Sequence, residues 1–165
     1  MERKILNCRY HTVYVLALLF IFNQSLNSQT FAPFGTGAFG NGVYAVAEYN
    51  GELIIGGGFL SVNGVPANGI ALWNGVSWSS LGPGINGCPV KTLAVYNGDL
   101  YAGGSFTTAG QTSANNIAKW NGVSWSSLGI GTDDDVEAMT IHNGILYKGG
   151  SCVNAGGLSA NSIAS

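Results

Sequence analysis

The chain has 165 residues, of which 26 are glycine and only 8% are charged, and its formal net charge is −2. This composition excludes a charged helical bundle and indicates turn-rich β-structure, while 46% hydrophobic residues exclude a disordered chain. The basic residues form no stripe, so we expect no nucleic-acid partner.

Residues 1–28 have the order of a secretory signal peptide. Three basic residues among the first nine precede an apolar run over 13–22, and a polar stretch follows over 23–30. An apolar run of this length rises only about 15 Å as a helix, half of a bilayer core, so we expect no stable transmembrane span. A short buried helix is the alternative interpretation of the apolar run, but it would not explain the basic residues before the run or the polar residues after it. We expect cleavage between Ser25 and Thr30 and a mature chain that is secreted, extracellular or at the cell surface.

An internal repeat occupies the rest of the chain. The ten residues Trp73–Gly82 recur without change as Trp120–Gly129, 47 residues further on. Flanking positions match at the same offset, and a third copy follows at an offset of 46. Residues 29–165 therefore divide into a leading segment, two full repeats and a partial third, at 29–42, 43–89, 90–135 and 136–165.

Turn-forming residues predict two hairpins in each repeat. In the first, the β-prone run over 43–49 ends at Asn50-Gly51, a pair that accepts the positive φ angles of a tight turn, and 53–55 returns from it. In the second, Ile70–Trp73 leads into Asn74-Gly75 and back through 76–81 as a hairpin of the same kind. Four short strands in about 47 residues predict an all-β fold, a β-propeller of four-stranded blades.

A glycine run, Gly56-Gly57-Gly58, ends the second predicted strand and is repeated in part at Gly103-Gly104. We expect close backbone approach between neighbouring blades at these positions, because a side chain would not fit. A phosphate-binding loop is the functional alternative. Such a loop requires a following helix and a lysine at the P-loop spacing, and the sequence after the glycine run predicts neither.

The leading segment 29–42 contains a fourth-strand sequence without a blade of its own. Residues 31–34 align with 78–81 at the same offset of 47, so we expect them to close the last blade of the ring. Ser165 aligns with Lys119, inside the third blade. We therefore expect either further repeats in the natural protein or a truncated product with exposed strand edges.

The sequence of the second repeat resembles kelch-type repeats of the galactose-oxidase-like propellers. The resemblance rests on Leu100–Phe106, Asn116–Trp120 and Trp125–Gly129, and it extends over residues 31–165. The repeats are also similar to those of Rax-type cell-polarity markers and of secreted Bacteroidota proteins that carry a type IX secretion sorting domain. The resemblance implies a propeller and, for the last group, export by the type IX route. The copper site of galactose oxidase does not carry over, because His142 is the only histidine after the signal segment.

Few residues are candidates for a chemical site. His142 precedes a predicted turn, where a surface position is expected rather than a metal ligand. The acidic group Asp133-Asp134-Asp135 with Glu137 has oxygen ligands for calcium, but it lacks the pattern of a calcium loop, so a solvated loop is favoured. Cys8 lies in the signal segment. The other two cysteines, Cys88 and Cys152, could form a disulfide after export or remain two buried thiols, and the sequence leaves this open.

The four tryptophans could form a sugar-stacking platform, but they recur at equivalent positions of the repeat, which favours packing between blades. They are Trp73, Trp78, Trp120 and Trp125. Polar loops at equivalent positions in the three repeats are expected on one rim, where a ligand would bind. These loops are 61–68, 107–115 and 153–161.

These features favour a binding or structural propeller with no catalytic, cofactor or metal site in this segment. Its ligand would be a protein or a glycan that the sequence does not specify. Two other functions stay open. The segment could belong to a larger extracellular lyase or hydrolase whose active site lies elsewhere, or it could be a ligand-free spacer in an adhesin.

Overall fold

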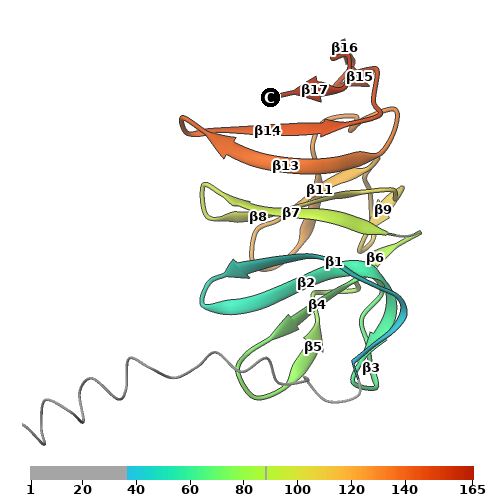
Figure 1. Ribbon diagram of the computed structural model, residues 1–165, viewed down its shortest axis with the longest axis vertical. Coiled ribbons are helices and arrows are strands. Elements are labelled where there is room, and N and C mark those ends of the chain that lie inside the picture. The colour runs from blue at the N-terminus through green and yellow to red at the C-terminus, as the bar shows by residue number, and fades with distance from the viewer. Residues whose placement is uncertain (1–36, 88) are drawn as a thin grey trace, which may run out of the picture. The chain divides into compact units, whose positions relative to one another are not determined.

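A computed structural model describes residues 37–87 and 89–165, which fold into antiparallel β-sheets (Figure 1). No helix occurs among these residues. The all-β fold predicted from the composition and the turns is confirmed. The signal segment, residues 31–34 and Cys88 lie outside the described residues.

The first sheet corresponds to the first repeat. Its strands follow the order β1-β2-β4-β5, with β3 beside the far end of β2. They are β1 (Ala38–Tyr49), β2 (Glu52–Val62), β3 (Val65–Pro66), β4 (Ile70–Trp73) and β5 (Trp78–Ser80). Of the segment 29–42, the structure describes only the end, where residues 38–42 form the start of β1.

The second sheet repeats this order of strands. It runs β7-β8-β11-β12, with β7 (Val90–Tyr96), β8 (Asp99–Gly104), β11 (Ile117–Trp120) and β12 (Trp125–Ser127). The third sheet has the order β13-β14-β17, with β13 (Val136–His142), β14 (Ile145–Gly150) and β17 (Ile163–Ala164). Figure 1 shows the first strands of the three sheets, β1, β7 and β13, following one another as successive layers.

Short strand pairs connect each repeat to the next. β6 (Ile85–Asn86) leaves the first sheet and pairs with β9 (Thr108–Ala109), which also pairs with β10 (Thr112–Ser113). One repeat later, Thr132 forms a bridge with Ala155 in the hairpin of β15 (Asn154–Ala155) and β16 (Leu158–Ser159). The backbone amides of Gly110 and Gly156 donate equivalent hydrogen bonds of 2.8 Å to the preceding repeat. The same link is therefore made at both junctions.

The first hairpin of the repeat forms as its turn residues predict. β1 and β2 are joined by Asn50-Gly51, whose φ angles are +54° and +80°, and Tyr49 pairs with Glu52. Positive φ at both central positions is the requirement that asparagine and glycine meet most readily. The equivalent asparagine-glycine turns also join β7 to β8 and β13 to β14.

The second hairpin differs from the two-residue turn that the sequence predicted. β4 and β5 end their pairing at Trp73 and Trp78, so a four-residue loop joins them. The side-chain Oδ1 of Asn74 accepts hydrogen bonds of 2.9 Å from the backbone amides of Val76 and Ser77. An asparagine that binds the backbone ahead of it in this way stabilises a wider loop. The same contacts recur in the β11–β12 hairpin.

The glycine pairs lie where the sheets approach most closely. A Cβ atom added to Gly56 would lie 2.6 Å from Cγ1 of Val90, and one added to Gly103 would lie 2.6 Å from Cγ1 of Val136. Each valine begins the first strand of the next repeat. Neighbouring repeats thus approach closely at the first glycine of each pair, but a valine side chain makes the contact, whereas backbone contact was predicted. The second glycine instead faces the backbone just before the first strand of its own sheet, since a Cβ on Gly104 would collide with the carbonyl oxygen of Pro89, which precedes β7.

Apolar side chains fill the space between the first and second sheets. This core joins residues of both repeats, among them Ile54, Leu81, Leu100, Trp120 and Trp125, each at most 7% exposed. A second cluster covers the opposite face of the first sheet. Its six buried members are Ile55, Phe59, Val62, Ala67, Ala71 and Trp78. At an offset of 47 they correspond to residues of the second repeat that lie in the first core, so the same positions of the repeat are apolar and buried in both.

Candidate functional site

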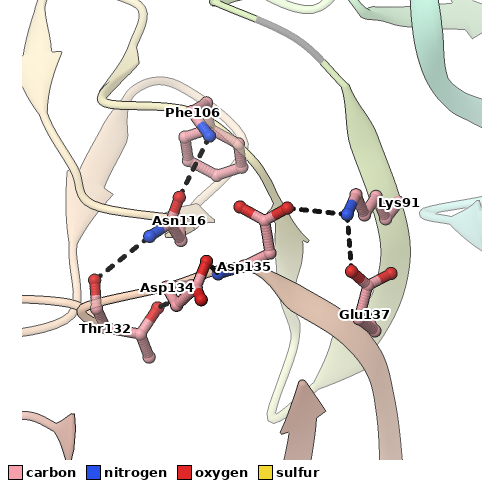
Figure 2. A network of polar contacts seen from close by, with 7 residues as sticks. All are labelled: Lys91, Phe106, Asn116, Thr132, Asp134, Asp135 and Glu137. Carbon is pink, nitrogen blue, oxygen red and sulfur yellow. Dashed lines mark hydrogen bonds and ion pairs between the residues drawn. The ribbon is translucent and has the colours of Figure 1, made fainter. Parts of the chain in front are cut away.

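The densest group of charges lies at the junction of the second and third repeats (Figure 2). The Nζ of Lys91, on β7, lies 2.7 Å from Oδ2 of Asp135, at the end of the second repeat, and 2.5 Å from Oε1 of Glu137, at the start of the third. Lys91 and Glu137 occupy the same position in consecutive repeats. Because the first strands of neighbouring sheets lie side by side, this position brings the opposite charges together.

The pKa values of these groups reflect their pairing. Hydrogen bonding to Asp135, and then to Glu137, raises the pKa of the Lys91 ammonium. Hydrogen bonds from Lys91 and Ser105 lower the pKa of the Asp135 carboxyl. The raised pKa of Lys91 and the lowered pKa of Asp135 both favour the charged forms that pair with each other. The cluster is suited to fixing the position of two strands, and the pairing leaves neither Lys91 nor Asp135 free to act as a base or acid near pH 7.

Asp133 fixes the loop that follows it by accepting backbone hydrogen bonds. Its Oδ1 accepts hydrogen bonds from the amides of Val153 and Asn154 at 3.0 and 2.9 Å, and its Oδ2 accepts one from Nδ2 of Asn154 at 2.8 Å. The amide of Asn154 makes the largest contribution to the lowered pKa of Asp133. The carboxylate oxygens therefore hold the start of the β15–β16 hairpin of the third repeat.

Asp133, Asp134 and Glu137 are exposed, as expected for a solvated loop, but most of the acidic group also makes specific contacts. Asp133, Asp135 and Glu137 each have a protein partner. In the part of the chain described by the structure, no group of three or more His, Cys, Asp or Glu side chains is placed to hold a metal ion.

Asn116 is a second junction residue, and the sequence did not single it out. Its Oδ1 accepts a hydrogen bond of 3.2 Å from the amide of Phe106, and its Nδ2 donates one of 3.1 Å to the carbonyl of Thr132 (Figure 2). The side chain therefore ties the segment after β8 to the connector that follows β12. The repeat did not indicate this role for Asn116, because the equivalent positions of the other repeats are Gly69 and Ser162.

The histidine and cysteine candidates lie apart from this cluster. His142 is exposed at the end of β13, beside the turn, and its ring centroid lies 6.4 Å from that of Tyr147. Cys152 is a free cysteine, 1% exposed, at the position that Phe59 and Phe106 occupy in the other repeats. Cys152 therefore fills a core position that an aromatic ring fills elsewhere.

Three of the four tryptophans are buried. Trp78, Trp120 and Trp125 are 6–8% exposed, and Trp73 is partly buried against the second apolar cluster. Nε1 of Trp125 donates a hydrogen bond of 3.3 Å to the carbonyl of Leu81 in the preceding repeat. Their rings pack within and between sheets, which leaves no flat aromatic platform for a sugar among these four residues.

The polar loops of the three repeats carry exposed side chains. In the second repeat, Thr107, Gln111, Ser113 and Asn115 are exposed within the loop 107–115, which includes β9 and β10. The loops 61–68 and 153–161 contain the corresponding hairpins, β3 with the end of β2, and β15 with β16. Because the same links to the preceding repeat recur at Gly110 and Gly156, the second and third loops have equivalent positions. These surfaces present hydroxyl and amide groups with few charges.

No protein-family model matches the sequence, and no curated protein matches it significantly. The structure places the chain in the class of all-β proteins built from repeated antiparallel sheets. No helix in the described residues has the length and apolar character needed to cross a bilayer.

Proposed function

We propose that the chain forms part of a kelch-like β-propeller that is exported and serves as a binding or structural module. The observation that carries this proposal is the repetition of one unit, four strands in antiparallel order, with the first strands of successive units side by side. Propeller blades have this strand order and this radial repetition. The link from each repeat to the rim hairpin of the next is consistent with a ring of such units.

A binding role at the rim is supported by the distribution of polar groups. At the junction of the second and third repeats, the charged side chains form ion pairs with one another or hydrogen bonds with backbone amides. The polar loops instead expose hydroxyl and amide side chains. Such groups form hydrogen bonds to the hydroxyls of a glycan or to the backbone of a protein. We therefore assign the ligand surface to the loops 61–68, 107–115 and 153–161, and we propose no catalytic residue.

A binding experiment with rim variants tests this function. The full chain is screened on a glycan array and in pull-downs from cell-surface extracts, together with Gln111→Lys and Val153→Lys, which change exposed rim residues. The control is Val123→Lys, on the β11–β12 loop, which is 83% exposed. A ligand lost in the rim variants and kept in the control supports the proposal. Uniformly negative binding, or equal binding by all variants, contradicts it.

Export is tested separately. Expression of the full chain with a C-terminal tag, followed by N-terminal sequencing of the secreted product, should place the first residue between positions 26 and 30, after the expected cleavage. An uncleaved chain that stays inside the cell would refute the secreted location.

A further inference from the structure

An amine and a thiol lie next to each other in the third repeat. Nζ of Lys148, on β14, lies 4.0 Å from Sγ of Cys152, which follows the strand. Among the described residues, the other two lysines, Lys91 and Lys119, form ion pairs with carboxylates, whereas Lys148 forms none. The amine of Lys148 therefore lies against a thiol instead of a carboxylate.

The other repeats have apolar side chains at these two positions. In the second repeat they are Ala102 and Phe106, which are both buried in the core shared with the first sheet. In the first repeat they are Ile55 and Phe59. Compared with the second repeat, the third has a long side chain, Lys148, in place of the small one and a small side chain, Cys152, in place of the aromatic ring. Two core side chains have thus been replaced together by two reactive ones.

The backbone fixes both residues of the pair. Lys148 pairs with Met139 on the neighbouring strand β13, and the carbonyl of Cys152 accepts a hydrogen bond of 2.8 Å from the amide of Ser162. The lysine amine is carried on a flexible four-carbon stem, so rotation of that stem can bring Nζ onto Sγ. Contact between the two atoms therefore requires no change in strand pairing.

We propose that Lys148 and Cys152 form an oxidative cross-linking site, at which hydrogen peroxide joins Nζ to Sγ as a sulfenamide. In the first step, Sγ attacks one peroxide oxygen, the O–O bond breaks, and the thiol becomes a sulfenic acid with release of one water. In the second step, the lone pair of the neutral amine attacks Sγ, the S–N bond forms, the S–O bond breaks, and a second water leaves. The sulfur is oxidised by two electrons and the peroxide is reduced to two waters.

The surroundings of the pair favour the amine as the partner of the oxidised sulfur. Cys152 is 1% exposed, which hinders attack by a second protein thiol or another bulky reagent more than it hinders peroxide. Burial also lowers the pKa of the Lys148 ammonium, and this raises the fraction of neutral amine. The cross-link needs no ligand at the polar loops, so its failure and the failure of loop binding are independent.

The test treats the full chain with hydrogen peroxide and measures its tryptic peptides by mass spectrometry. Trypsin cuts after unmodified Lys148 and separates residues 120–148 from 149–165. We expect the oxidised chain to lose this cut in at least about half of the molecules and to give a 120–165 peptide about 2 Da lighter than its reduced form. Dithiothreitol should restore the cut.

Variants distinguish the cross-link from other oxidation products. Lys148→Arg keeps the charge and the trypsin site, but its guanidinium stays protonated and does not attack sulfur. Cys152 should then gain about 16 or 32 Da as sulfenic or sulfinic acid. Cys88→Ser should leave the cross-link unchanged, because a disulfide is not its cause. A cut that persists after Lys148 in the oxidised chain, a light peptide that Cys88→Ser abolishes, or the same light peptide from Lys148→Arg overturns the proposal.

Discussion

Replacement of Gly103 by alanine provides the sharpest test of how the repeats pack. The new Cβ would lie 2.6 Å from Cγ1 of Val136 and 2.9 Å from Cγ2 of Thr92. Ordinary carbon contacts are about 3.5–4.0 Å, so one of these side chains must move. Val136 is fully buried and has little room to do so. Overpacking of this kind lowers the free energy of unfolding by about 1–3 kcal/mol.

Gly149 offers a matched control at the equivalent position of the third repeat. A Cβ added there would meet only the carbonyl oxygen of Ser162, at 3.7 Å, which is an ordinary contact. Neither glycine has a positive φ angle, so alanine is compatible with both backbones. We expect Gly149→Ala to change the free energy of unfolding by no more than about 0.5 kcal/mol, or to raise it slightly by reducing the entropy of the unfolded chain.

The assay is urea unfolding followed by tryptophan fluorescence, with Val136→Ala and the double variant completing a cycle. Val136→Ala alone should cost about 2 kcal/mol, because two buried methyl groups are lost and a small cavity remains. Since that cavity accepts part of the alanine at position 103, the double variant should be at least about 1 kcal/mol more stable than the sum of the single effects predicts. Equal effects of Gly103→Ala and Gly149→Ala, or strict additivity in the cycle, would refute the close packing described for this junction.

Three further changes test other parts of the structure. Trp125→Ala should lower the free energy of unfolding by about 3–5 kcal/mol in the same urea assay, because a buried ring and its hydrogen bond to Leu81 are lost; a cost under about 1 kcal/mol would contradict its core position. Lys91→Met should lower it by about 0.2–1 kcal/mol at pH 7. The pKa of Asp135 is lowered in the fold, so its contribution is complete above about pH 4 and is lost as the pH falls through the lowered pKa. Unfolding curves at pH 6 and pH 2.5 should therefore show that the deficit of Lys91→Met shrinks in acid, and a constant deficit would exclude the ion pair as its cause. Asp133→Ala should speed amide hydrogen exchange at Val153 and Asn154, and unchanged exchange there would show that the carboxylate does not fix the hairpin.

Local signals in the sequence account for the parts of the fold that were predicted correctly. Asn50-Gly51 determines its turn through its own backbone preferences, so the β1–β2 hairpin follows from two residues. Asn74-Gly75 has the same two residue types but lies in a wider, four-residue loop, because the side chain of Asn74 accepts hydrogen bonds from the amides of Val76 and Ser77. Dipeptide chemistry alone does not distinguish the two cases.

The junction contacts could be predicted only in part. Lys91 lies 44 and 46 residues from its two partners, so no local pattern connects them. The repeat offset does relate Lys91 to Glu137, and opposite charges at one repeat position indicate neighbouring strands. Asp135 and Asn116 have no such signal, because their roles depend on the path of the connector between sheets. The two-residue strands of the loops were missed because two residues carry no periodicity.

The links made by Gly110 and Gly156 have a consequence for how such a chain lengthens during evolution. Each repeat presents one kind of contact to the unit before it and one kind to the unit after it, as at the Gly56–Val90 and Gly103–Val136 junctions. A tandem duplication of about 47 residues, begun at any point within a repeat, therefore reproduces both kinds of contact without inventing a new one. Growth by whole units is neutral to the packing, whereas an insertion of a few residues in a strand shifts the register of a sheet. The single-residue difference between the two offsets falls after Asn86, where β6 ends, and before Val90, where β7 begins, so it lies outside both strands.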